Sequence, residues 1–136
     1  MARLLQRYLS LDGRLARLPF FIRSIYLGIG TAAVAVMTVP LFAGGGVWWW
    51  LGLGVVVASL AFFALSSVSL IVRRLHDLGL SGYHAIWVGA AEAGWSVLSS
   101  APPRVMFLSL PLGAISLWLL LWPGNRDANR FGQSAA

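Results

Sequence analysis

The sequence predicts an all-α integral membrane protein, a four-helix bundle in a single domain covering residues 1–136. Three observations predict this class. First, 59% of the residues are hydrophobic and 10% are charged, whereas ordinary soluble domains have about 45–50% and about 25%. Second, no charged residue occurs in the stretch 24–72. Third, all ten basic residues are arginine, and nine of them fall on one side of the predicted helices.

The charge-free stretch is long enough to cross a membrane twice. As one helix its 49 residues would extend ~74 Å, whereas the hydrocarbon core of a bilayer is ~30 Å thick. Pro40 and the glycines at 44–46 supply the expected break, because proline ends helices and glycine turns freely. We therefore expect the first two helices at about 21–42 and 48–72.

The second half of the chain predicts two shorter helices, at 83–100 and 105–122. Each would extend ~27 Å, which is enough to cross a slightly thinned bilayer. The Ala-Pro-Pro-Arg segment at 101–104 is typical of a tight turn. An alternative has three crossings, with 83–100 buried against protein or lying at the membrane interface.

Arginine placement sets the predicted orientation. With four crossings, Arg104 lies alone on one side, and excess positive charge favours the cytoplasmic side. Both termini and the loop between the second and third helices are therefore expected in the cytoplasm of a bacterial cell, with the helices in its inner membrane. Residues 2–9 add a short helix expected to lie in the interface, since apolar i,i+4 pairs oppose its arginines; a frayed end is the alternative.

Composition also excludes several kinds of site. Cysteine is absent, so the chain has no disulfides, thiolate metal sites or cysteine nucleophiles. It has no phosphate-binding glycine loop, serine nucleophile motif or paired carboxylates. We therefore expect no enzyme, no catalytic residue, no metal and no cofactor. The positive charge follows from the topology and does not indicate nucleic-acid binding.

Polar residues collect in three predicted cytoplasmic clusters, at 12–17, 73–83 and 123–132. Each contains one aspartate among surplus arginines. We expect Asp77 to accept a bidentate hydrogen bond from an arginine of another cluster, so that the clusters join into one polar latch. The candidate residues, for this latch or for binding anionic lipid headgroups, are Arg14, Arg17, Arg73, Arg74, His76, Asp77, Ser81, Asn125, Arg126, Asn129 and Arg130.

Other roles for these polar residues stay open. Asp77 would instead stabilise its own loop if it accepted nearby backbone N–H groups. Surplus guanidiniums attract phosphates at about 1 kcal/mol per basic residue, with lipid headgroups favoured over a phosphorylated small molecule. Within the loop, Gly79 and Gly82 are expected to turn with positive φ, and Ser81 is expected to cap the third helix.

The three clusters also resemble those of a known family. The chain has Gly-Arg-Leu-Ala-Arg at 13–17, Arg-Arg-Leu-His-Asp-Leu-Gly-Leu-Ser-Gly-Tyr at 73–83 and Pro-Gly-Asn-Arg-Asp-Ala-Asn-Arg-Phe-Gly at 123–132. In this order they are similar to the motifs of the small bacterial inner-membrane family catalogued as domain of unknown function 805. The positions that depart from its pattern are Leu18-Pro19, Tyr83 and Ala128. The resemblance covers nearly the whole chain and implies an integral inner-membrane protein of no stated activity.

Glu92 is an acid in the middle of the third predicted helix, where a charge costs ~2.5–3.5 kcal/mol on insertion scales. We expect it to be protonated or hydrogen-bonded. Its candidate partners are Ser96, Thr31, Ser59 and Ser116. Nearby, Ala85, Gly89 and Ala93 form a ridge of small residues that permits close helix approach. Glu92 is therefore a neutral packing residue, a proton- or cation-binding site, or a glutamate that lies at the membrane interface.

These features favour a non-enzymatic role. The first hypothesis is an accessory or scaffolding subunit of a larger membrane assembly, or an organiser of its lipid surroundings. Its partners would be membrane lipids and another inner-membrane protein, or a second copy of the chain. The alternatives are a small transporter or channel subunit that uses Glu92, and a protein that binds anionic lipid on the cytoplasmic side.

Overall fold

All regular elements in the described part of the chain are helices, so the predicted all-α class is confirmed. The structure is a computed structural model that describes residues 8–100, 102 and 107–134. Its helices are α2 (Arg17–Gly44), α3 (Gly46–Asp77), the 3-10 helix η1 (Gly82–His84), α4 (Ala85–Ser99), the 3-10 helix η2 (Phe107–Ser109) and α6 (Leu110–Leu121). Two of them, α2 and α3, are long and apolar enough to cross a membrane.

The turn between α2 and α3 differs from the predicted break. Pro40 lies inside α2, where it removes one backbone hydrogen bond close to a helix end that has unpaired groups in any case. The chain turns at Gly45, whose φ of 64° and ψ of −176° are essentially restricted to glycine. The prediction of a break at the glycines is therefore confirmed, and the prediction of a break at Pro40 is wrong.

Two predicted features fall largely outside the described residues. Of the N-terminal helix expected at 2–9, the structure describes Tyr8 and Leu9, and both are helical. Of the tight turn expected at 101–104, it describes Pro102, which is exposed. The rest of each feature stays a prediction.

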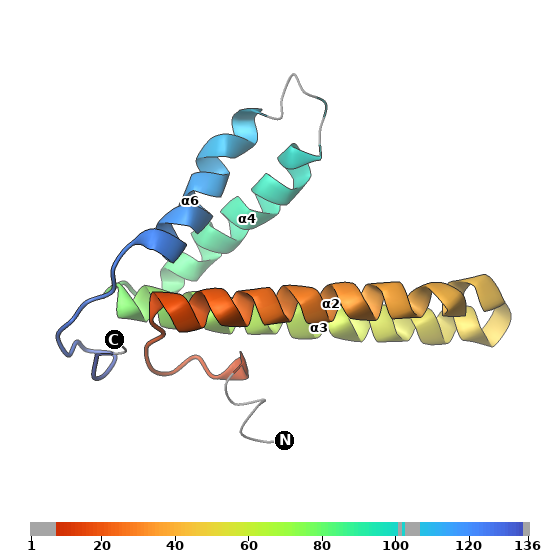
Figure 1. Ribbon diagram of the computed structural model, residues 1–136, viewed down its shortest axis with the longest axis horizontal. Helices are drawn as coiled ribbons and strands as arrows, with labels where there is room; N and C mark the ends of the chain where they lie inside the picture. The colour runs from red at the N-terminus through yellow and green to blue at the C-terminus, as the bar shows by residue number, and fades with distance from the viewer. Residues whose placement is uncertain (1–7, 101, 103–106, 135–136) are drawn as a thin grey trace.

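The four main helices form two antiparallel hairpins that share one end and diverge from it (Figure 1). α2 packs along α3, and α4 packs along α6. The predicted number of main helices is right, but their arrangement is more open than a closed four-helix bundle. α4 and α6 have 15 and 12 residues, against 28 and 32 in α2 and α3, so the second hairpin is too short to cover the first.

The buried core sits at the shared end, which we call the junction. It is formed by apolar residues from all four main helices and from the segment before α2. They are Leu15, Phe20, Leu27, Leu70, Ile71, Leu75, Val88 and Leu119. Away from the junction, large apolar side chains are exposed, as at Met37 in α2, which is 76% exposed. Extended apolar surface of this kind is typical of contact with lipid or with another protein.

Glycines bring α4 and α6 close together. A Cβ atom at Gly94 would lie 2.8 Å from Cδ1 of Leu112, and one at Gly113 would lie 2.6 Å from Cζ3 of Trp95. Gly94 adjoins the ridge of small residues that the sequence predicts on α4. Gly89, within that ridge, faces open space instead. The prediction that small residues on α4 permit close helix approach therefore holds at Gly94, which was predicted beside the ridge, and not at Gly89.

Replacing Gly45 by alanine should destabilise the α2–α3 turn by about 1–3 kcal/mol, because an L side chain strains this backbone conformation. The free energy of unfolding is measured by denaturant titration in detergent micelles. The control is Gly54→Ala, a helical position in α3 that faces open space, where alanine should be neutral or stabilising by up to about 1 kcal/mol. Equal effects of the two substitutions would contradict the role of Gly45.

Candidate functional site

The three polar clusters meet at the junction, around the carboxylate of Asp77. Arg14 donates from Nε and Nη2 to Oδ1 of Asp77, at 3.2 and 3.1 Å, and Arg74 donates from Nη1 to Oδ2 at 2.6 Å. All three residues are buried: Arg14 is 8% exposed, Arg74 0% and Asp77 2%. Arg14 therefore uses one carboxylate oxygen, not both as a bidentate pair would, because Arg74 occupies the other.

The length of α3 explains why Arg74 and Asp77 meet. This helix runs to Asp77, five residues beyond the predicted end, so the two residues lie at i and i+3 on one helix face. Leu78 is the C-cap of this helix, and Gly79 follows it with a φ of 78°, the left-handed conformation that glycine commonly adopts just past a helix end. A Cβ atom there would lie 2.8 Å from Nδ2 of Asn125. Gly79 therefore both ends α3 and leaves room for the C-terminal tail.

Arg74 joins α3 to the C-terminal end of α6. Its Nε donates to the carbonyl oxygen of Leu119 at 2.8 Å, and its Nη2 donates to that of Trp122. The last carbonyl groups of a helix have no intrahelical partner, and a cation placed there also interacts favourably with the helix dipole. Arg74 is fully engaged in this way, so its guanidinium is not available to a lipid phosphate.

Arg14 holds the C-terminal tail. Its Nη1 donates to the carbonyl oxygens of Asp127 at 2.7 Å and Gly132 at 3.3 Å, and its Nη2 donates to that of Asn125. The backbone N–H of Asn125 in turn donates to the carbonyl oxygen of Asp77 at 2.9 Å. One guanidinium thus connects the segment before α2, the end of α3 and the tail.

A second set of contacts surrounds His76. Its ring stacks on Phe131 with 3.9 Å between ring centroids and 7° between ring planes, and its Nδ1 lies 3.2 Å from the carbonyl oxygen of Gly13. Nδ2 of Asn129 donates to the carbonyl oxygen of His76 at 2.9 Å. The guanidinium of Arg130 lies 4.7 Å from the centroid of Phe131, a cation–π distance. These contacts hold His76 between the tail and the N-terminal segment.

Two tail residues that sequence reasoning did not select are part of this site. A Cβ atom at Gly124 would overlap the Asp77 carboxylate, so the chain passes there only as glycine. Phe131 supplies the ring that stacks on His76. Both belong to the tail motif at 123–132. The sequence signal for Phe131 is an aromatic residue directly after asparagine and arginine in a polar segment.

Four predicted residues use no side chain in either the Asp77 contacts or the His76 contacts described above. Arg17 and Arg126 are exposed. Arg73 contributes its carbonyl oxygen, which accepts from the backbone N–H of Leu15 at 3.0 Å. Ser81 precedes η1 without a capping bond from its side chain, so its predicted capping role is wrong: the 3-10 turn satisfies the helix start through backbone groups, since the N–H of His84 donates to the Ser81 carbonyl oxygen.

The prediction of positive φ at both loop glycines is half right. Gly79 has positive φ, and Gly82 is not among the positive-φ residues of the described chain. Gly82 begins η1 instead, where a Cβ atom would lie 3.0 Å from Cγ1 of Val72. Close packing, not backbone conformation, therefore favours glycine at Gly82.

Glu92 lies apart from the latch, between the two hairpins. The nearby side chain of Ser116 in α6, one of its predicted partners, interacts favourably with its carboxylate. Thr31 and Ser59 donate instead to carbonyl oxygens of their own helices. Glu92 also borders a cavity of about 140 Å³ whose other walls come from α2 and α3. Among the described residues, no group of three side chains is suited to hold a metal ion.

Together these features define a class: an apolar, all-helical protein whose two hairpins are joined by a buried arginine–aspartate network. The chain belongs to the family described as "Protein of unknown function (DUF805)", whose model matches residues 8–133. This is the family that the three polar motifs resemble. A search of curated proteins and a search of solved structures gave no match.

Replacing Asp77 by asparagine should destabilise the protein by about 3–5 kcal/mol, because two buried guanidiniums would lose their counter-charge. The control is Asp127→Asn, since Asp127 is exposed and contacts Arg14 through its main-chain oxygen. That change should stay within about 0.5 kcal/mol. Unfolding free energies in micelles compare the two, and similar losses would contradict the central place of the Asp77 carboxylate.

Proposed function

We propose that this chain is a non-enzymatic, multi-pass protein of the bacterial inner membrane that serves as an accessory or scaffolding subunit of a larger membrane assembly. One observation carries the proposal: the hairpins are fixed to each other at the junction and diverge beyond it (Figure 1). A fixed, open pair of hairpins presents apolar helix faces at a set angle. Such faces suit contact with the helices of another membrane protein.

The latch supports an arrangement in which both termini lie on one side of the membrane. Arg14 before α2, Asp77 at the end of α3 and Asn125 after α6 contact one another. Each hairpin therefore returns the chain to the side on which it started. The alternative with three crossings would put the tail on the far side of the membrane from Asp77. The arginine bias favours the cytoplasm for the shared side.

Helix lengths support a need for a partner. The 27 residues of α3 before Arg73 extend ~40 Å, so this helix fits a ~30 Å hydrocarbon core only when tilted. α4 and α6 extend ~22 and ~18 Å, and they diverge from α3. The far end of α4 at Ser99 would then lie within the hydrocarbon core. Unpaired carbonyl groups at that depth require cover from protein or trapped water.

The proposal predicts a specific neighbour at the far part of α4. A photo-crosslinking amino acid at Val97, which is 70% exposed, should form one discrete adduct with another membrane protein in native membranes. The same probe at Arg126, which is exposed on the tail, is the positional control. Adducts are identified by mass spectrometry after mild detergent extraction.

A matched pair of variants tests whether the junction matters for this contact. Asp77→Asn should reduce the Val97 adduct, because the angle between the hairpins is no longer fixed, whereas Asp127→Asn should retain it. Recovery of the chain without a partner from every preparation would contradict the accessory role. An unchanged adduct in Asp77→Asn would contradict the role of the fixed angle.

The cavity beside Glu92 favours a second candidate, a proton- or cation-conducting subunit. Ser24 of α2 and Ser67 of α3 border this cavity with Glu92, so polar groups from both hairpins face one space. Intramembrane acids of this kind commonly belong to ion pathways. The cavity has room for a few water molecules.

This candidate predicts that Glu92→Gln abolishes proton flux into vesicles reconstituted with the protein. The neutral amide keeps the size of the side chain and can still bond to Ser116, so protein abundance and folding should not change. The flux is followed with a pH-sensitive dye, and Asp127→Asn is the control for loss of an acid elsewhere. Flux that is equal in Glu92→Gln and in the unmodified protein would exclude Glu92 as the conducting group.

A further inference from the structure

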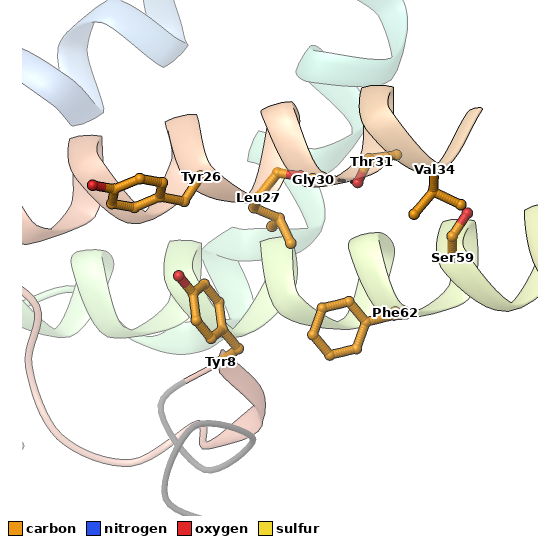
Figure 2. A pocket seen from close by; sticks show the side chains of 8 residues that line it. All are labelled: Tyr8, Tyr26, Leu27, Gly30, Thr31, Val34, Ser59 and Phe62. Atoms are coloured by element: carbon orange, nitrogen blue, oxygen red, sulfur yellow. Dashed lines mark hydrogen bonds between the residues drawn. The ribbon is translucent and has the colours of Figure 1, made fainter. Parts of the chain in front are cut away.

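A groove of about 290 Å³ runs between α2 and α3. Its walls include Gly30 and Val34 of α2 and Phe62 of α3, and Tyr8 from the N-terminal segment closes one end (Figure 2). The cavity beside Glu92 has different walls apart from Leu27, so the groove is a separate feature. Its lining is almost entirely apolar.

Two arginines stand in line with this groove, at the junction end. Arg23 is seven residues before Gly30 on α2, and Arg73 is eleven residues after Phe62 on α3. These separations are close to two and three helical turns, so each arginine shares a helix face with a groove residue, ~10 and ~16 Å away along the axis. The two guanidiniums are close enough to repel each other electrostatically.

The charge of Arg23 lacks a counterpart in the described part of the chain. Its Nη1 is buried and makes no hydrogen bond there, although buried guanidinium groups nearly always have acceptors. Asp77, the buried acid of the junction, is already shared by Arg14 and Arg74. A buried N–H donor beside a second guanidinium costs free energy, which an anion bound between them would recover.

The N-terminal segment is held across this end of the groove. The hydroxyl of Ser69 donates to the carbonyl oxygen of Ser10, and the N–H of Leu15 donates to that of Arg73 at 3.0 Å. Tyr8 and Tyr26 both line the groove, and Figure 2 shows them toward its end nearer the start of α2. Tyrosine is the side chain that favours the headgroup level of a bilayer.

We propose that the groove holds an acyl chain of an anionic phospholipid, whose phosphate pairs with Arg23 and Arg73. The tyrosine hydroxyls then lie level with the ester groups between phosphate and chain. Free phosphate would leave the apolar groove unfilled, and an apolar partner helix would leave Arg23 without an anion. Only a molecule with both an anionic group and an apolar chain can pair with the arginines and also fill the groove. The inference requires the membrane location but not the accessory role.

The test counts lipids bound to the full-length protein by native mass spectrometry. The protein is equilibrated in micelles with phosphatidylglycerol or with phosphatidylcholine of the same acyl chains. The choline ammonium of phosphatidylcholine offsets the phosphate charge that attracts the two arginines, so phosphatidylglycerol should be favoured by about thirtyfold. Arg23→Gln should reduce this preference by about fivefold. The matched control is Arg126→Gln, which removes an exposed arginine far along the chain from the groove and should keep the preference.

A second pair of variants tests the acyl-chain part of the site. Gly30→Leu fills the groove, and open space around Gly30 means that the fold should tolerate the change. Gly28→Leu is its control, since Gly28 also faces open space but does not line the groove. Gly30→Leu should weaken retention of phosphatidylglycerol, and Gly28→Leu should not, with the melting temperature unchanged in both.

Three results would overturn the proposal. Equal retention of the two lipids by the unmodified protein would show that no anion is selected. Displacement of phosphatidylglycerol by millimolar inorganic phosphate, together with no effect of Gly30→Leu, would show a phosphate site without an acyl chain. A protein partner cross-linked from Phe62 in place of lipid would assign the groove to a helix.

Discussion

The junction depends on one carboxylate. Asp77 lies between the guanidiniums of Arg14 and Arg74, and the three groups are buried from water, where an unpaired charge is far more costly than at a surface. Each arginine binds more than the carboxylate, because it also donates hydrogen bonds to main-chain oxygens of a segment distant in sequence. The ion pair therefore does more than neutralise charge, since it fixes where α6 and the tail lie against α3.

A polar junction suits a chain whose helices are apolar on nearly every face. Between such helices in lipid, apolar burial gives little preference for one arrangement, because acyl chains are as apolar as leucine. Specificity must then come from close approach at small residues and from hydrogen bonds. This molecule uses both, with glycines between α4 and α6 and the arginine–aspartate network at their base, and leaves the outer ends of the hairpins apart.

The sequence predicts the helices well because charge-free runs of membrane length have few alternatives. It also predicts that Asp77 meets an arginine of another cluster, since each cluster has a single acid. It does not predict the acceptors of Arg74. These are the main-chain oxygens of Leu119 and Trp122, and every residue type has such an oxygen. The sequence also does not predict that the hairpins diverge, because the hydropathy of a helix says nothing about its angle to another helix. Nor does the sequence single out Arg23, which stands by itself outside the three polar clusters.

The order in which the latch residues are translated has a consequence for biogenesis. Arg14 binds carbonyl groups at Asn125 and Asp127, which leave the ribosome after every helix has been made. Until then Arg14 and Arg74 can both pair with Asp77, but Arg14 lacks the acceptors that the tail supplies. All four main helices are therefore complete before the latch can close, and a chain that ends before the tail leaves N–H donors of Arg14 without their main-chain acceptors.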